Sequence, residues 1–280
     1  MARRLFIFAA YDKDAIIDDS VLVYVRALSE IGDIVFYMDS DAADSELAKV
    51  RKLVLYAGAS RHNEYDFGSY KRGFEWAKNN IDLNYYDWIY FVNDSMYAPL
   101  NPISPILEDL ESRGTDAAGI VRYPGKREHI QAWFFGASKK LFLSQNFLNF
   151  ITGIKFAGGK SGVISKYEHG FTRMLKSGGY SFCIKRTLHG RGVYNRIKWL
   201  FRHGFPFMKK LSITRKRGYL GSQILYIIEH ANPEIRDAIM QNANRVYGAD
   251  YMKWLLTKNP LRILARGLRH FLLKIFKEGI

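Results

Sequence analysis

The sequence predicts an α/β fold in which a mixed, mainly parallel sheet carries helices on both faces. Short apolar runs alternate along the chain with segments whose apolar residues recur every three or four positions. The first three of these segments, residues 5–10, 20–32 and 33–39, follow the order strand, helix, strand. This opening is typical of a parallel sheet with crossover helices. With 48% hydrophobic residues among 280, the chain can also bury a sizeable core.

The remaining elements follow from the same patterns. After the strand expected at residues 52–58, a polar loop leads to a helix that begins at Ser69 or Tyr70 and ends at Asn79 and Asn80. Helices are also expected at residues 44–50, 103–114, 139–154 and 165–179, and strands at 52–58, 88–92, 116–121, 131–138 and 180–185.

The charge of the chain is concentrated at one end. The net charge is +15, and residues 1–180 contain 22 basic and 22 acidic side chains, so the excess comes from residue 181 onward, where 20 Lys and Arg face 5 Asp and Glu. We therefore predict two domains, residues 1–190 and a basic, aromatic-rich helical extension at 191–280. Such a segment can attract nucleic acid, anionic lipid or a phosphorylated substrate.

Cysteine usage and apolar run lengths bear on the compartment. Cys183 is the single cysteine, so no intramolecular disulfide can form, which favours a reducing compartment. The apolar stretch after Arg3 and Arg4 spans only residues 5–10 and is predicted to be a strand, not a signal peptide. No apolar run approaches the roughly 18 to 20 residues that span a bilayer, so we expect a cytoplasmic protein.

Acidic residues follow three of the predicted strands. Asp12 comes after the first strand, Asp66 lies in the loop after residues 52–58, and Asp94 follows residues 88–92 between Asn93 and Ser95. Ligands of open α/β sheets bind beyond the carboxyl ends of strands, which is where these carboxylates would stand. Asp94 could reach a divalent metal that holds a diphosphate. Ordinary turn chemistry at a strand end is the alternative.

The segment "NEYDFGSYKRG" allows two interpretations. In the first it is a binding loop, in which Gly68 lets the backbone approach a ligand. Asp66 would accept a hydrogen bond from a base or a ribose hydroxyl, and Lys71 or Arg72 would face phosphate. In the second it is the start of a helix, with Asp66 or Ser69 as the cap and aromatic side chains in the core.

Two later segments add polar candidates. His129 and Gln131 are two residues apart in an extended segment, so both could face a cleft and bind a sugar or phosphate, or they could form a structural pair. Glu168 precedes His169 in the first turn of a predicted helix. It could act as a general base on an acceptor hydroxyl, or it could complement the helix dipole.

The end of the chain has the pattern of a basic amphipathic helix. Leucine, isoleucine and phenylalanine recur every three or four positions between residues 261 and 275, with Arg and Lys among them. Residues 195–211 add Trp199, Phe201 and further aromatics among basic side chains. This pattern is typical of helices that lie on an anionic membrane surface. Packing on the protein itself, or nucleic-acid binding with Trp199 and Phe201 stacked on bases, are the alternatives.

Five segments together resemble the rhamnan synthesis F family of bacterial polysaccharide glycosyltransferases. The family pattern contains "FAHYD", "N-x-GYDFGSWK", "NDSVYGPL", "HLQSYF" and "I-x-x-YE-x-G-x-T". This sequence has "FAAYD" at 8–12, "NEYDFGSYK" at 63–71, "NDSMYAPL" at 93–100, "HIQAWF" at 129–134 and "ISKYEHGFT" at 164–172. The likeness covers about residues 4–182. It departs from the pattern at Ala10, Glu64, Ala98 and Ala132.

The resemblance implies a GT-A-like, Rossmann-type nucleotide-sugar fold over residues 1–190, in which "NDS" replaces the Asp-x-Asp metal element. It implies a cytoplasmic enzyme that is peripheral on the inner face of the plasma membrane. The enzyme would move a sugar, with rhamnose expected, from a nucleoside diphosphate donor to a lipid-linked glycan. This reaction belongs to the synthesis of cell-surface polysaccharide (O-antigen or cell wall). Asp94 would hold Mg²⁺ or Mn²⁺ against the donor diphosphate. Glu168 would be the base, and the other donor contacts would be Asp12, Tyr65, Asp66, Gly68, Lys71, Asn93, His129 and Gln131.

On this interpretation no nucleic-acid partner is expected. Two alternatives stay open. A scaffold of a polysaccharide assembly complex would keep the fold and bind no nucleotide sugar. A nucleic-acid-binding protein would use the basic region after residue 190.

Overall fold

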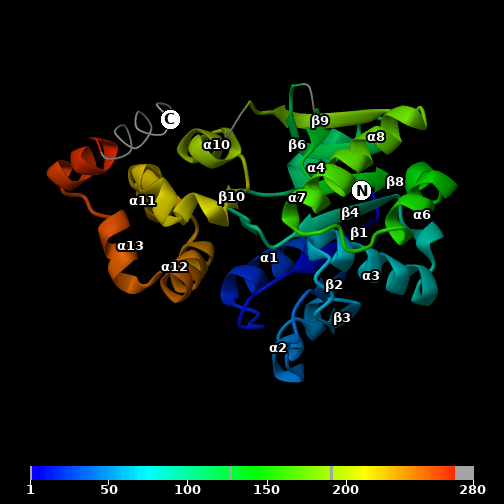
Figure 1. The fold of residues 1–280 in the computed structure, drawn as a ribbon, viewed down its shortest axis with the longest axis horizontal. Coiled ribbons are helices and arrows are strands. Elements are labelled where there is room, and N and C mark those ends of the chain that lie inside the picture. Colours follow the sequence, from blue (N-terminus) through cyan, green and yellow to red (C-terminus); the bar gives the residue numbers. More distant parts are fainter. Residues whose placement is uncertain (1, 126–127, 190–191, 269–280) are drawn as a thin grey trace. The chain divides into compact units, whose positions relative to one another are not determined.

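The computed structural model describes residues 2–125, 128–189 and 192–268 (Figure 1). The chain forms two compact units. The first unit comprises residues 1–17, 24–94 and 103–190, and the second comprises residues 18–23, 95–102 and 191–280. Two short stretches of the N-terminal half thus cluster with the C-terminal part of the chain.

The first unit is built on an eight-stranded mixed sheet with the order β3-β2-β1-β4-β8-β6-β7, in which β9 also pairs with β6. The pairs β2–β3, β1–β2, β1–β4 and β6–β9 are parallel, whereas β8 is antiparallel to β4 and β6, and β7 is antiparallel to β6. The predicted α/β class with a mainly parallel sheet is confirmed. The strands are β1 (Arg4–Ala10), β2 (Asp33–Met38), β3 (Tyr56–Ala59), β4 (Trp88–Asn93), β6 (Ala117–Tyr123), β7 (His129–Ile130), β8 (Phe134–Ser138) and β9 (Phe182–Thr187).

Both faces of this sheet are covered, which explains why β1 is apolar from Leu5 to Ala10 and β4 from Trp88 to Val92. All seven residues of β1 are buried. Leu5, Ile7 and Ala9 belong to the core that includes α3 (Tyr65–Asn80), α6 (Gln145–Thr152) and α8 (His169–Ser177). The alternate side chain Phe8 packs edge-on against Tyr24 of α1 (Asp19–Ser29).

Several element boundaries differ from the sequence prediction, three of them clearly. The strand expected at 52–58 is a 3-10 helix, η1 (Arg51–Leu53), followed by β3, because β2 pairs only from Tyr56 onward. The helix expected at 139–154 is divided into α5 (Lys139–Phe142) and α6, since the Ser144 hydroxyl caps α6 by accepting from the Phe147 amide at 3.3 Å. The helix expected from Ser69 or Tyr70 begins earlier, at Tyr65.

Further elements of the first unit are α2 (Asp44–Ala48), η2 (Leu83–Tyr85), α4 (Ser104–Glu111), α7 (Lys160–Val163) and a π-helical turn, η3 (Ile164–Glu168). In the second unit, β5 (Met96–Tyr97) pairs antiparallel with β10 (Met208–Lys209). Its helices are α9 (Gly192–Asn195), α10 (Ile197–Arg202), η4 (Lys210–Ile213), η5 (Arg215–Leu220), α11 (Gly221–His230), α12 (Pro233–Tyr247) and α13 (Ala249–Leu255). Residues 260–268 are also helical.

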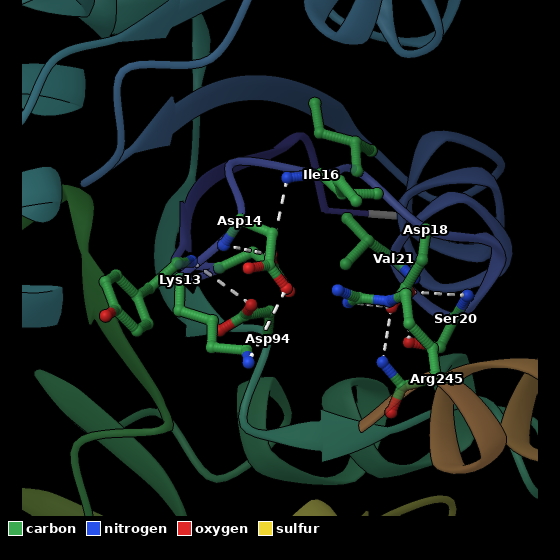
Figure 2. Close-up of polar contacts among 12 residues, drawn as sticks. Lys13, Asp14, Ile16, Asp18, Ser20, Val21, Asp94 and Arg245 are labelled. Atoms are coloured by element: carbon green, nitrogen blue, oxygen red, sulfur yellow. Dashed lines mark hydrogen bonds and ion pairs between the residues drawn. The ribbon is translucent and has the colours of Figure 1, made fainter. Parts of the chain in front are cut away.

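A buried carboxylate ties together separate segments of the second unit (Figure 2). Asp18 is 8% exposed, and its Oδ1 accepts from the Ser20 amide and hydroxyl at 3.1 and 2.6 Å. Its Oδ2 accepts from Asn242 and Arg245 of α12. Burial raises the pKa of Asp18, but Lys210 and these donors outweigh burial and bring the pKa below its ordinary value. Residues 18–23 are thereby anchored to a helix more than two hundred positions away.

Candidate functional site

Asp94 lies at the carboxyl end of β4, beside the end of β1. The register pairs Asn93 with Ala9, and the Asp94 amide donates to the Ala9 carbonyl at 3.1 Å. The Asp94 Oδ2 atom in turn accepts from the Tyr11 amide at 3.2 Å. Figure 2 shows the carboxylate pointing toward the loop that carries Lys13 and Asp14. Parallel pairing of β1 and β4 therefore fixes Asp94 at the edge where ligands of α/β sheets bind.

Asp66 joins this edge through Asn93. The buried Asn93 side chain donates from Nδ2 to Asp66 Oδ2 at 2.9 Å. The other oxygen of Asp66, Oδ1, accepts from the Phe67 amide at 3.0 Å in the first turn of α3. A carboxylate in the first turn of a helix is stabilised by the positive end of the helix dipole. The start of α3 thus brings a second acidic side chain to the end of β4.

Glu168 reaches the same edge from the other side of β4. Because β8 is antiparallel to β4, the residues that precede β8 lie beside the end of β4, and the Asn93 amide donates to the Trp133 carbonyl at 3.1 Å. The neighbouring Ala132 amide donates to Glu168 Oε1 at 3.0 Å. Glu168 ends the π-helical turn η3, one position before α8. Single π-turns of this kind are frequent at functional sites.

The buried hydroxyl of Tyr70 lies among these acidic groups. Tyr70 donates to the Ala132 carbonyl at 2.9 Å. Burial raises the pKa of Tyr70 well above its usual value, and the negative charges of Asp66, Asp94 and Glu168 raise it further. One phenol in α3 therefore experiences three carboxylates that come from three separate segments. Tyr70 is not among the site residues predicted from the sequence, although it follows Asp66 by one helical turn and shares its face.

His129 and Gln131 both lie next to this network. His129 Nε2 is 3.8 Å from Glu168 Oε1, and its ring lies 4.4 Å from that of His169 and 5.6 Å from that of Tyr123. The side-chain oxygen of Gln131 accepts from the Trp133 indole at 2.7 Å. The structure thus places His129 beside the candidate base, whereas Gln131 orients an aromatic ring.

Asp12 and Tyr65 shape the loops that flank the site. The Asp12 Oδ1 atom accepts from the Asp14 and Ile16 amides at 2.8 and 3.4 Å, which closes its own loop (Figure 2). The backbone amide and carbonyl of Asp12 both bond to Ser40 after β2. Tyr65 begins α3 with a φ of 59° and is 41% exposed. The turn before the helix therefore leaves the Tyr65 ring at the surface.

The "YDFG" segment is the first turn of a helix, in agreement with the second of the two interpretations of this segment. Gly68 is buried inside α3, where an added Cβ would come within 2.7 Å of the His62 ring. Its missing side chain makes room for that ring. The Lys71 ammonium donates to the Ile154 carbonyl at 3.0 Å, and Arg72 pairs with Glu64 at 2.5 Å. Both cations of the segment thus have partners within the first unit.

His62 and Asp39 hold the turn before α3, and neither is among the site residues predicted from the sequence. The carboxylate of Asp39, after β2, accepts from the His62 and Asn63 amides at 2.9 and 3.0 Å. The Glu64 amide donates to His62 Nδ1 at 3.1 Å, so Nε2 carries the proton and donates to Ser69 at 3.0 Å. No local pattern distinguishes His62 from an ordinary loop residue, so its role could not be predicted from the sequence.

We expect stability to fall between pH 7 and pH 5 because of His62. Burial lowers its pKa from 6.5 to about 4, so the folded state favours the neutral ring while the unfolded state gains a proton below pH 6.5. The stabilisation is complete above pH 6.5 and is lost as the pH falls toward 4, with a loss of about 2 kcal/mol at pH 5. Urea unfolding of the wild type and His62→Gln at both pH values measures this difference. Equal pH dependence of the two proteins would contradict it.

The family comparison covers most of the chain. A model of the rhamnan synthesis protein F family matches residues 34–273. The chain belongs to the rhamnan synthesis protein F family. The match confirms the family resemblance and covers four of the five motifs, while the motif at 8–12 lies before it. It extends well beyond residue 182, so most of the second unit is also part of what the family shares. No curated protein matches this sequence.

Proteins with solved structures resemble the chain weakly. A proposed nucleotide-diphospho-sugar transferase from Desulfovibrio desulfuricans G20 has 13% identity and a TM-score of 0.41, over 70% of this chain and 88% of its own. A nucleoside-diphosphate-sugar pyrophosphorylase from Vibrio cholerae RC9 has 10% identity and a TM-score of 0.41, over 66% and 92%. The glycosyltransferase GlyE of Streptococcus pneumoniae TIGR4 has 10% identity and a TM-score of 0.43, over 91% and 63%.

Proposed function

We propose that this member of the rhamnan synthesis protein F family is a glycosyltransferase that moves a sugar from a nucleoside diphosphate donor to a lipid-linked glycan. The observation that carries the proposal is that Asp66, Asp94 and Glu168 are held at the carboxyl end of β4 by hydrogen bonds with Asn93, Ala9 and Ala132. Acidic groups at this edge suit both the hydroxyls of a nucleotide sugar and the proton of an acceptor. Rhamnose is the proposed sugar because of the family to which the chain belongs.

Asp94 is the proposed ligand of a divalent metal. Among the described residues no three His, Cys, Asp or Glu side chains are grouped to hold a metal ion by themselves. Mg²⁺ is commonly held by one or two carboxylates together with substrate phosphates, and Asp94 with its fixed orientation fits that role. A bound metal would offset the charge that develops on the leaving diphosphate. Asp66 and Asn93 would then orient the donor through its hydroxyls.

Glu168 is the proposed general base. The Ala132 amide holds Oε1 in place, and the side chain is 17% exposed, so solvent or an acceptor can reach the carboxylate. The base would take the proton of the attacking acceptor hydroxyl as the glycosidic bond forms and the nucleoside diphosphate leaves. His129, at 3.8 Å from Oε1, would help to position it.

Donor binding is the most direct test. Thermal unfolding should be measured with a panel of nucleoside diphosphates and nucleotide sugars, with and without Mn²⁺. We expect one nucleotide series to raise the midpoint in the wild type and to raise it less in Asp94→Asn, with the difference largest when Mn²⁺ is present. A panel in which no nucleotide shifts the midpoint would contradict the proposal.

We further propose that residues 260–268 bind an anionic membrane surface. Among the described residues, no helix combines the length and apolar character that crossing a bilayer requires. Leu261, Leu264 and Leu268 are 75, 62 and 54% exposed and lie three and four positions apart on one helical face. Arg262 of the same segment is exposed and complements an anionic leaflet, whereas Arg266 is buried and donates to the Leu255 carbonyl. The rest of the predicted amphipathic helix, residues 269–280, lies outside the described residues.

Substitution of this leucine face should weaken vesicle binding. We expect Leu261→Ser with Leu264→Ser to lower the affinity for phosphatidylglycerol vesicles by about tenfold or more, since each buried leucine contributes on the order of 1.5 kcal/mol. High salt should weaken the remaining binding. Leu55→Ser, at a leucine that is 46% exposed in the first unit, is the matched control. Unchanged vesicle binding, or retention on oligonucleotides but not on vesicles, would refute the membrane role.

A further inference from the structure

The second unit contains a cavity of about 570 Å³ that is rich in positive charge. Three consecutive cations of η5 contribute to its wall, together with two tyrosines. None of the described residues that line it is acidic. The lining residues are Leu211, Thr214, Arg215, Lys216, Arg217, Tyr219 and Tyr247.

The two arginines of this cavity are held in place by groups that leave their charge uncompensated. The Arg217 guanidinium donates to the Leu211 carbonyl at 2.8 Å and lies 4.4 Å from the Tyr194 ring centroid. Arg215 donates to the Tyr247 carbonyl at 3.3 Å and lies 4.8 Å from the Tyr251 ring centroid. Carbonyls and aromatic rings orient a guanidinium without neutralising it. Each arginine therefore keeps further N–H donors and a full positive charge for a ligand.

The chemistry of this cavity selects an anion with several acceptor oxygens. Guanidinium groups bind phosphate oxygens with paired hydrogen bonds, and Lys216 adds a point charge. The cavity is much larger than one phosphate, and its lining includes Leu211, which is 41% exposed, and the aromatic side chains of Tyr219 and Tyr247. A ligand that joins phosphate groups to an apolar or sugar moiety would use both kinds of surface.

We propose that this cavity binds the diphosphate of the lipid-linked acceptor, an inference that rests on the proposed glycosyltransferase function. In a lipid-linked glycan the diphosphate joins the lipid to the sugar chain and is constant while the glycan grows. A cationic cavity in the second unit would thus recognise the invariant part of the acceptor. The donor diphosphate is assigned to Asp94 in the first unit, so the two diphosphates have separate sites.

Calorimetric titration of the full chain with geranyl diphosphate tests the proposal without nucleotide or membrane. We expect binding that weakens at least about tenfold in Arg215→Gln/Lys216→Gln, because two charged hydrogen-bond partners are lost. The matched control is Arg236→Gln/Lys253→Gln, which removes one half-buried and one exposed charge of the same unit outside the cavity. This control and Asp94→Asn should both bind within about twofold of wild type.

Several results would overturn the proposal. The first is the absence of geranyl diphosphate binding. The second is an equal loss of geranyl diphosphate affinity in the control double variant. The third is a loss of that affinity in Asp94→Asn, which would place the probe in the donor site. If inorganic pyrophosphate binds as tightly as geranyl diphosphate, the claim that the bound diphosphate belongs to a lipid is refuted. If Arg215→Gln/Lys216→Gln fails to fold, Lys216→Gln alone, at an exposed position, replaces it. Failure of donor binding with intact geranyl diphosphate binding would refute the proposed function separately.

Discussion

Replacement of Glu168 by glutamine should lower turnover by about 10²- to 10⁴-fold while donor binding stays close to that of the wild type. Glutamine has nearly the same shape, and its side-chain oxygen can still accept from the Ala132 amide, which holds Glu168 Oε1 at 3.0 Å. It cannot take a proton from an acceptor hydroxyl. The expected loss is therefore in kcat, with donor affinity from thermal shift as the second readout.

The pH profile separates a base from a merely structural carboxylate. If Glu168 takes the proton, the acidic limb of the wild-type kcat profile should be absent from the residual activity of Glu168→Gln. Glu30→Gln, at an exposed glutamate after α1, is the matched control and should leave turnover unchanged. Near-normal turnover of Glu168→Gln would show that the base has been misassigned. Loss of donor binding in that variant would instead indicate a binding role.

The sheet and the position of Asp94 could be predicted because they depend on local patterns. A strand buried on both faces is mostly apolar, and residues 5–10 of β1 and 88–92 of β4 show this run in the sequence. The βαβ order then implies parallel pairing, which places the residue after β4 at the ligand edge. The position of Asp66 was predicted less well, because positive φ angles at Asn63 and Tyr65 start α3 before the apolar periodicity begins.

The contacts that complete the site could not be predicted, because they join residues that are remote in the sequence. Tyr70 and Ala132 are 62 positions apart, and Glu168 and Ala132 are 36 apart. They meet because β8 runs antiparallel to β4, and no periodicity within either segment shows that direction. The same holds for Asp18 and Arg245, which are 227 positions apart and belong to one unit. A pattern along the chain shows faces and ends of elements, whereas these contacts depend on their arrangement.

Removal of the Glu111 carboxylate should produce the largest loss of stability. Arg4 of β1 donates from Nε and Nη2 to the two oxygens of Glu111 in α4 at 2.6 and 2.7 Å, and the Tyr90 hydroxyl donates to the same group at 2.9 Å. The Arg4 and Glu111 side chains are only 2 and 9% exposed. Glu111→Ala leaves a buried guanidinium without its counter-ion, and we expect a loss of about 3 to 5 kcal/mol in the free energy of unfolding from urea denaturation.

A double substitution tests whether that loss comes from the stranded charge. Arg4→Met/Glu111→Leu removes both charges and keeps most of the buried volume, so it should be less destabilising than Glu111→Ala alone. Asp44→Ala, which breaks the exposed pair with Arg51, should have a much smaller effect, because solvent screens both partners. If the double variant is at least as unstable as Glu111→Ala, the ion pair itself stabilises the fold. The desolvated charge would then not be the reason for the loss, and the packing of α4 on the sheet would depend on the pair.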